Sequence, residues 1–318
     1  MKGPLASRKI GRCQEAALCS ICVCGTELTK PCTKEVVGRL TREHWPLSLS
    51  RRCGSAMIWR QWLWDLFEMR DVLGWRRKFG VIGPSTNTVV QPDFEMIRPA
   101  GVTNHYSRIF TPNTQAISNE SFMAGINIIG DNVLDAVRSV MTCSPDYLVM
   151  GMSSITFNGG AAGADAFQAK IEREAGVSIS IGSHSSTAAL KAYGDVKRIA
   201  FLSPYYPVAN AEVRRYFVEF GFEVVRDICL QCKSWTGIAE VPPGVLRDKL
   251  IELNGDGRDT DALIQVGTNP SMVRLAAAAE VWLGKPVVAI NTATYWHALR
   301  QNNIKDKIAG LGRLLEEF

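Results

Sequence analysis

Residues 79–88 read FGVIGPSTNT, and residues 198–207 read RIAFLSPYYP. Each stretch begins with a short apolar run and ends in a polar turn, as expected for a buried strand and the loop after it. Two further stretches, 146–154 (DYLVMGMSS) and 261–269 (DALIQVGTN), repeat this pattern at nearly the same separation. Two pairs of similar stretches in the same order predict a chain built from two similar lobes.

Amphipathic stretches fill the intervals between these apolar runs. Strands that alternate with helices indicate βαβ units and mostly parallel sheets, so we expect an α/β fold. Helices are expected at 122–141, 165–175, 187–192, 211–220, 243–253, 271–282 and 296–301.

Composition sets limits on the class of protein. The 318 residues are 46% hydrophobic, which is enough for a sizeable core. No apolar run reaches the roughly 18 residues of a membrane span, and the start lacks the order of a secretory signal, so a cytoplasmic protein is expected. Residues 1–77 hold 14 basic and 7 acidic residues, against 22 and 24 in the remainder, so the net charge of +5 does not predict a nucleic-acid partner.

The first quarter of the chain differs from the remainder in hydrophobic periodicity and in cysteine content. Residues 1–68 show no sustained helical or strand period and contain six of the nine cysteines. They lack the two spaced pairs of ligands of a zinc site, so no metal is expected. We interpret residues 1–77 as an N-terminal extension outside the domain, either from a start codon assigned too far upstream or as a tail with its own partner. The first alternative is favoured.

Cys229 and Cys232 form a CxxC pair. This pair could be redox-active, or it could be two small residues in a strand or loop. The second interpretation is favoured because no helix start follows to lower a thiol pKa.

Polar loops follow four of the expected strands, at 83–88, 152–158, 203–210 and 267–271. The carboxyl ends of parallel strands face one edge of a sheet, so these loops could converge on one crevice. Neutral donors there would suit a carboxylate, or the enediolate formed when charge moves onto it. The same residue types are common in turns and helix caps, but their joint placement favours a site. The residues are Ser85, Thr86, Asn87, Ser153, Ser154, Tyr205, Asn210, Thr268 and Asn269.

Histidine offers the first candidate for proton transfer. His184 ends an apolar run and could reach the crevice, although a loop histidine bonded to the backbone is an equal alternative. No GxSxG nucleophile motif and no phosphate-binding loop occurs in the sequence.

These loops, with the stretch 284–299, resemble the maleate isomerase and arylmalonate decarboxylase family of the Asp/Glu racemase superfamily. The resemblance runs from Lys78 to the C-terminus. It implies two α/β lobes related by a pseudo-two-fold axis, formed by 78–195 plus 288–318 and by 196–287. It also implies a substrate bound between the lobes, and neither a metal nor an organic cofactor.

The resemblance assigns roles to individual residues. Asn87 is similar to the carboxylate-binding Asn of the family, and Tyr205 to its substrate-binding Tyr. Ser153 and Ser154 resemble the hydroxyl residues of the oxyanion pocket, and Asn210 a second substrate-side Asn. Ser85, Thr268 and Asn269 are further candidates for substrate binding.

The sequence departs from the family at two positions. Family isomerases use one cysteine from each lobe, but Met152 and Gly267 stand at these positions here. Neither can donate or accept a proton, so thiol chemistry does not carry over. A bulky Met152 opposite a bare Gly267 predicts a lopsided, more apolar pocket.

Three functions stay open. The first is a cofactor-independent decarboxylase or isomerase of a small carboxylic or dicarboxylic acid, with His184, Tyr205 and Ser153 as catalytic candidates. The second is an inactive carboxylate-binding protein on the same scaffold, and the third is unrelated chemistry on this fold. A homo-oligomer is possible, but nothing in the sequence fixes the number of copies.

Overall fold

The chain divides into two units, Met1–Glu68 and Met69–Phe318. The computed structural model describes residues 71–318, so the predictions for residues 1–70 lie outside the described part. Within 71–318, no helix is long and apolar enough to cross a membrane.

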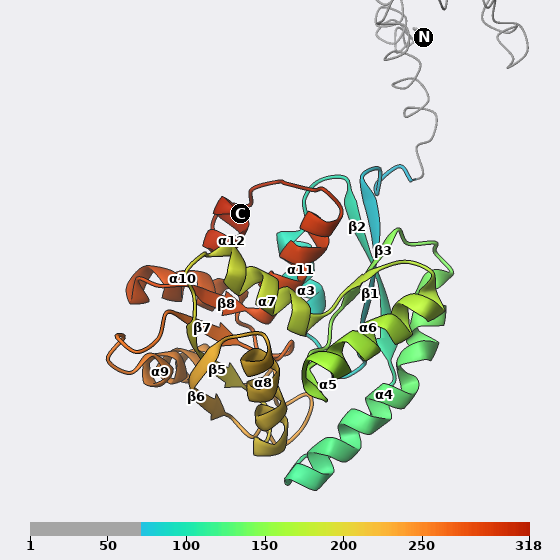
Figure 1. The fold of residues 1–318 in the computed structure, drawn as a ribbon. Coiled ribbons are helices and arrows are strands. Elements are labelled where there is room, and N and C mark those ends of the chain that lie inside the picture. Colours follow the sequence, from blue (N-terminus) through green and yellow to red (C-terminus); the bar gives the residue numbers. More distant parts are fainter. Residues whose placement is uncertain (1–70) are drawn as a thin grey trace, which may run out of the picture. The chain divides into compact units, whose positions relative to one another are not determined.

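Two parallel four-stranded sheets carry the fold (Figure 1). The first contains β1 (Arg77–Pro84), β2 (Val102–Ile109), β3 (Tyr147–Met150) and β4 (Ile179–Ser180), in the order β2-β1-β3-β4. The second contains β5 (Arg198–Ser203), β6 (Glu223–Cys229), β7 (Ala262–Gln265) and β8 (Val287–Ala289), in the order β6-β5-β7-β8. Because the two orders correspond strand by strand, the expectation of two similar α/β lobes is confirmed.

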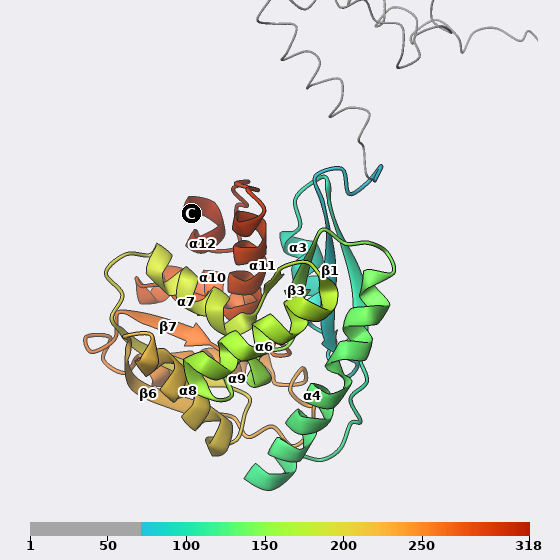
Figure 2. The same cartoon turned by 45° about the vertical axis from the view of Figure 1, so that its right-hand side comes forward.

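Helices follow the strands in both lobes. In the first lobe these are α3 (Val90–Ile97), α4 (Asn119–Met141), α5 (Ser154–Phe157), α6 (Gly160–Ala175) and α7 (Gly182–Ala192). In the second lobe they are α8 (Pro207–Glu219), α9 (Pro243–Asn254) and α10 (Val273–Leu283). Helices α11 (Ile290–Gln301) and α12 (Arg313–Glu317) come after the last strand, β8. Figure 2 shows α4 running along the outside of the first sheet.

Helix α11 follows the last strand of the second sheet but packs on the first lobe, against α7 and α3. Tyr295 of α11 stacks near Phe94 of α3 and Phe79 of β1, with ring centroids 4.9 and 5.7 Å apart. Its hydroxyl donates to Asn104 Oδ1 of β2 at 2.9 Å. Burial of such aromatic side chains stabilises a fold by several kcal/mol, on the order of 1.5–3 each. Helix α11 therefore ties the second lobe to the first.

Candidate active site

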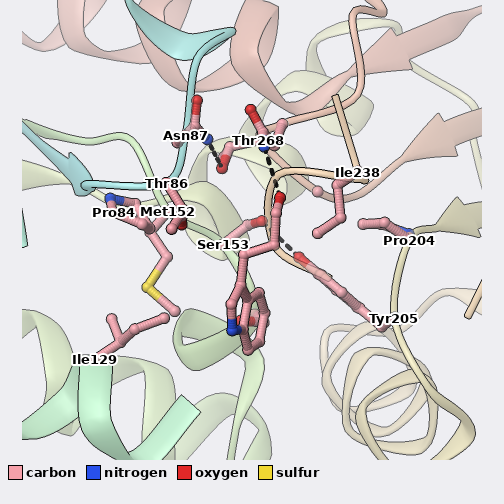
Figure 3. A pocket seen from close by; sticks show the side chains of 14 residues that line it. Pro84, Thr86, Asn87, Ile129, Met152, Ser153, Pro204, Tyr205, Ile238 and Thr268 are labelled. Carbon is pink, nitrogen blue, oxygen red and sulfur yellow. Dashed lines mark hydrogen bonds between the residues drawn. The ribbon is translucent and has the colours of Figure 1, made fainter. Parts of the chain in front are cut away.

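Loops after β1, β3, β5 and β7 converge on a cavity of about 40 Å³ between the lobes. Figure 3 shows side chains from both lobes directed toward it. The lining residues are Pro84, Thr86, Asn87, Ile129, Met152, Ser153, Ser154, Pro204, Tyr205, Trp235, Ile238, Gly267, Thr268 and Asn269. No Cys, His, Lys, Arg, Asp or Glu from the described part of the chain lines this cavity.

Two hydroxyl groups meet across the lobes on one side of the cavity. Ser153 Oγ, at the end of the β3 loop, lies 2.5 Å from the hydroxyl of Tyr205, in the β5 loop. Both residues are almost completely buried, and burial raises the pKa of the Tyr205 phenol far above its usual range. Tyr205 is therefore a neutral donor at physiological pH. Only one of the two hydroxyl protons lies between the oxygens. The proton of the other hydroxyl is therefore free to form a hydrogen bond with a ligand.

The backbone of Tyr205 is fixed by its neighbours. Its N–H donates to Ser203 Oγ at 3.1 Å, and its carbonyl accepts from the Gln231 amide at 3.1 Å. The Tyr205 ring lies beside Phe122 of α4, with centroids 5.7 Å apart. These contacts from three segments hold the hydroxyl in place without using it.

Amide side chains link the lobes on the other side of the cavity. Asn87 Nδ2 donates to Thr268 Oγ1 at 3.1 Å, while Asn87 Oδ1 accepts from the amides of Val89 and Val90 where α3 begins. Asn269 Oδ1 accepts from the Thr88 amide at 3.0 Å. Asn87 and Thr268 are thus a second pair of neutral polar groups placed by both lobes.

An apolar wall completes the cavity. It is formed by Ile129 of α4, Met152, and Trp235 and Ile238 of the connection between β6 and α9. Figure 3 shows the Met152 side chain directed toward Ile129. The cavity therefore has a polar part and an apolar part.

Gly267 leaves no room for a side chain. Its φ is +130°, a conformation that L-residues rarely adopt. An added Cβ would lie 2.4 Å from Pro204 Cδ. The close approach of the loops after β5 and β7 therefore depends on glycine at this position.

Three residues expected at the site lie elsewhere. His184 is on α7, where its Nδ1 lies 2.9 Å from the Tyr216 hydroxyl and its Nε2 3.0 Å from Asp165 Oδ1. Burial lowers its pKa, which the nearby Asp165 partly offsets. The structure does not bring His184 into the cavity, because α7 turns its ring toward α8 instead.

Ser85 and Asn210 also serve structural contacts. Ser85 Oγ accepts from the Thr111 amide at 3.0 Å. Asn210 accepts a hydrogen bond from Ser203 Oγ and donates to Asp227 at 2.7 Å. Asn210 thus acts one step behind the cavity, because Ser203 in turn holds the amide of Tyr205.

Sequence reasoning missed Trp235 and Ile238. They lie in a connection that bonds to the first lobe, where the Ala116 amide donates to Lys233 O at 2.9 Å. The indole of Trp235 packs on Gly125 of α4, and Asn269 Nδ2 donates to Trp235 O at 2.9 Å. A tryptophan in the polar segment 233–240 was the signal available.

The three cysteines of residues 71–318, Cys143, Cys229 and Cys232, do not line the cavity. Burial raises the pKa of Cys232 to about 11 and raises that of Cys229 as well, so neither is an activated thiol. Cys143 follows α4, and its carbonyl accepts from Lys78 Nζ at the start of β1, at the edge of the sheet opposite the cavity. Within 71–318, no group of His, Cys, Asp and Glu residues is arranged to hold a metal ion.

Paired parallel sheets with a cavity between them define an α/β protein with the Asp/Glu racemase-like fold. A family model described as arylmalonate decarboxylase matches residues 84–315, and the chain belongs to this family. The predicted resemblance is therefore confirmed.

Individual relatives agree with this assignment. Maleate isomerase from Pseudomonas putida is 25% identical over 255 residues, which cover 75% of this chain and 96% of that protein. A Nocardia farcinica maleate cis-trans isomerase, solved as a cysteine-to-serine mutant with a covalently bound succinylcysteine intermediate, gives a TM-score of 0.67. It is 20% identical, over 76% of this chain and 99% of its own. A crystal structure of arylmalonate decarboxylase gives a TM-score of 0.61 at 21% identity, over 75% and 98%.

Proposed function

We propose that this protein is a cofactor-independent decarboxylase of a small malonate-type acid. The observation that carries the proposal is the Ser153–Tyr205 pair, two neutral hydroxyls held 2.5 Å apart in a cavity that no Cys, His, Lys, Arg, Asp or Glu of residues 71–318 lines. Membership of a family with decarboxylase and isomerase members supports an enzyme. The side chains that line the cavity favour decarboxylation over isomerisation.

Decarboxylation needs only what this cavity offers. One carboxylate leaves as CO₂, and the electron pair of the broken C–C bond moves onto the remaining carboxylate to form an enediolate. The Thr268 hydroxyl can donate to its oxygens, and so can the one hydroxyl of the Ser153–Tyr205 pair whose proton does not lie between the two oxygens. Preorganised neutral donors in a buried site stabilise such charge strongly, by about 3 kcal/mol for a single donor.

The same hydroxyl pair can supply the proton. The enediolate carbon is a far stronger base than a phenolate, so a proton moves from Tyr205 to carbon even though burial raises the pKa of the phenol. Ser153 stabilises the phenolate through their short hydrogen bond, and water then restores the proton. The net reaction consumes one proton and releases one CO₂.

Isomerisation of a double bond requires catalytic groups that decarboxylation does not. It requires a nucleophile that adds to carbon and then leaves, and racemisation requires proton carriers on two faces. No thiol, amine, imidazole or carboxylate from the described residues lines this cavity. For this reason decarboxylation is preferred over the isomerase alternative.

The cavity also limits the substrate. A volume of about 40 Å³ holds little more than water, so a substrate must displace part of the lining. Trp235 and Ile238 are the candidates to move, because one loop carries both of them. The apolar wall suits an acid with an apolar group, and we expect a compact doubly charged acid such as maleate to bind weakly.

The test uses the full chain with 2-substituted malonates, maleate and aspartate in heavy water, followed by proton NMR. We expect protein-dependent loss of CO₂ from a substituted malonate, with one deuterium entering the product. Isomerisation of maleate without decarboxylation would overturn the proposal.

If none of these acids reacts but one of them raises the melting temperature of the protein, the binding-protein alternative is favoured. That alternative draws on the same observation, since a cavity lined by neutral polar and apolar side chains also suits a receptor for a carboxylate.

A further inference from the structure

A second hollow, of about 240 Å³, lies between α3 and the start of α10. It is lined by Val89, Pro92, Asp93, Met96, Ser271 and Arg274, none of which lines the cavity between the lobes. We call it the α3–α10 groove. It is larger than the cavity, and the proposed function makes no use of it.

Asp93 places a buried carboxylate in the groove. The residue is only 5% exposed, and its Oδ2 accepts from Asn291 Nδ2 at 2.7 Å. Its Oδ1 has no hydrogen-bond partner among residues 71–318, nor does any cation of that part pair with it. A buried carboxylate without a cation is costly to retain, which suggests that something else neutralises it.

Arg274 places a positive charge in the same groove. Its Nε lies 3.2 Å from Met96 Sδ, and the side chain is exposed. No carboxylate of the described residues pairs with Arg274 either. Asp93 and Arg274 therefore line one groove with opposite charges that do not pair with each other.

We propose that the α3–α10 groove binds a small molecule with both an ammonium group and a carboxylate, such as an α-amino acid. The ammonium group pairs with Asp93 at the buried end, and the carboxylate pairs with the guanidinium of Arg274. Pro92, Met96 and Val89 contact the hydrocarbon part of the ligand. Binding supplies each of the two unpaired charges with its missing partner.

Hydrogen bonds connect this groove to the cavity. Asn291 Nδ2, which donates to Asp93, also donates to Thr268 O at 2.9 Å. The Thr268 hydroxyl accepts from Asn87, whose Oδ1 holds the start of α3, the helix that carries Asp93. Occupancy of the groove thus stabilises the placement of Thr268 and Asn87. By linkage, a carboxylate in the cavity and a ligand in the groove strengthen each other's binding.

The experiment measures binding of L-alanine, L-serine and L-leucine to the full chain by calorimetry. Ethylamine and propanoate serve as probes that each carry only one of the two charges. The variants are Asp93→Asn, Arg274→Gln and Tyr205→Phe. Arg247→Gln is the control, because Arg247 is exposed and, within residues 71–318, bonds only to its neighbour Asp248.

We expect at least one of the amino acids to bind saturably, with an affinity at least ~10-fold lower in Asp93→Asn, a loss of about 1.4 kcal/mol. Arg274→Gln should weaken it as well, while Arg247→Gln and Tyr205→Phe leave it unchanged. Each single-charge probe should bind more weakly than the amino acid.

Absence of saturable binding by all three amino acids would overturn the proposal. Binding that survives both Asp93→Asn and Arg274→Gln would do so too, and Arg274→Gln keeps this test valid if Asp93→Asn misfolds. Binding that Tyr205→Phe abolishes would place the ligand in the cavity instead. Because no turnover is measured, the result does not depend on the proposed decarboxylase activity.

Discussion

Ser153 Oγ and the hydroxyl of Tyr205 lie 2.5 Å apart although they belong to different lobes. Their contact is thus a property of the assembled lobes, since neither lobe alone forms the pair. If the pair supplies the proton for an enediolate, removing the phenol should stop turnover while leaving most of the cavity intact. We expect Tyr205→Phe to lower kcat by at least ~100-fold and to change ligand affinity little.

The neighbouring Tyr206 provides a matched control. It is also buried, its hydroxyl donates to Ala116 O, and it does not line the cavity. Tyr206→Phe should therefore cost about 1 kcal/mol of unfolding free energy and leave kcat unchanged. Equal losses of kcat in the two variants, measured by the NMR assay, would show that Tyr205 matters only for stability.

Gly125 of α4 explains how Trp235 reaches the wall of the cavity. A Cβ at Gly125 would lie 2.3 Å from Trp235 Cζ2. Alanine favours a helix over glycine by about 1 kcal/mol, but a rigid indole cannot give way cheaply. We expect Gly125→Ala to destabilise the protein by roughly 1–3 kcal/mol and to weaken ligand binding, as measured by urea unfolding and calorimetry.

Gly130 on the same helix tests whether the clash with Trp235 causes the effect expected for Gly125→Ala. A Cβ there would lie 3.0 Å from Ile155 Cδ1, the flexible end of a side chain. Gly130→Ala should be neutral or slightly stabilising and leave ligand binding unchanged. If both glycine variants behave alike, packing against Trp235 is not the reason for Gly125.

The sequence predicted the buried strands better than the exposed ones. β1 and β5 read as apolar runs because the residues at their carboxyl ends are buried. β2 and β6 lie at the edges of their sheets and are largely half-exposed, so they read as polar segments and were missed. Helix α11 was expected only from residue 296, because residues 290–296 are buried all round and show no amphipathic period.

The site divides in a similar way. Loop residues directly after a strand, such as Ser153, Tyr205 and Thr268, lie where parallel-sheet topology places them. Trp235 depends on a crossing from the second lobe to α4, which no local pattern encodes. His184 was misplaced because the direction of a side chain on the first turn of α7 depends on packing against α8.

Cysteines introduced at positions 152 and 267 should lower the free energy of unfolding by different amounts. Met152 is a cavity residue with a flexible side chain, so Met152→Cys should fold with a loss of about 1–3 kcal/mol. Gly267→Cys must place a Cβ against Pro204 at a φ of +130°, and we expect a larger loss, of about 2–5 kcal/mol. Urea unfolding of both variants measures the difference.

Gly267→Ala separates the Cβ from the sulfur. It adds the same Cβ without a thiol and should therefore lose nearly as much stability as Gly267→Cys. An alanine variant as stable as the original protein would contradict this account of Gly267.

Asp93 should make stability depend on pH in an unusual direction. Burial raises its pKa from 3.8 to about 6, and the hydrogen bond from Asn291 only partly opposes this. Between these pH values the folded protein holds a proton that the unfolded chain has released. Protonation therefore favours the folded state in this window, and the contribution of Asp93 falls as pH rises from about 4 to about 6. Above that window its cost is complete, at about 3 kcal/mol.

Asp93→Asn removes this titration and keeps an acceptor for Asn291. The unfolding free energy of the original protein minus that of the variant should therefore be higher at about pH 4 than at about pH 7, by as much as ~3 kcal/mol. Asp131→Asn, at an exposed position on α4, is the control and should show a much smaller change. A difference that is constant with pH in Asp93→Asn would mean that Asp93 titrates alike in both states. An amino acid bound in the α3–α10 groove should reduce the cost at neutral pH, because its ammonium group neutralises the carboxylate.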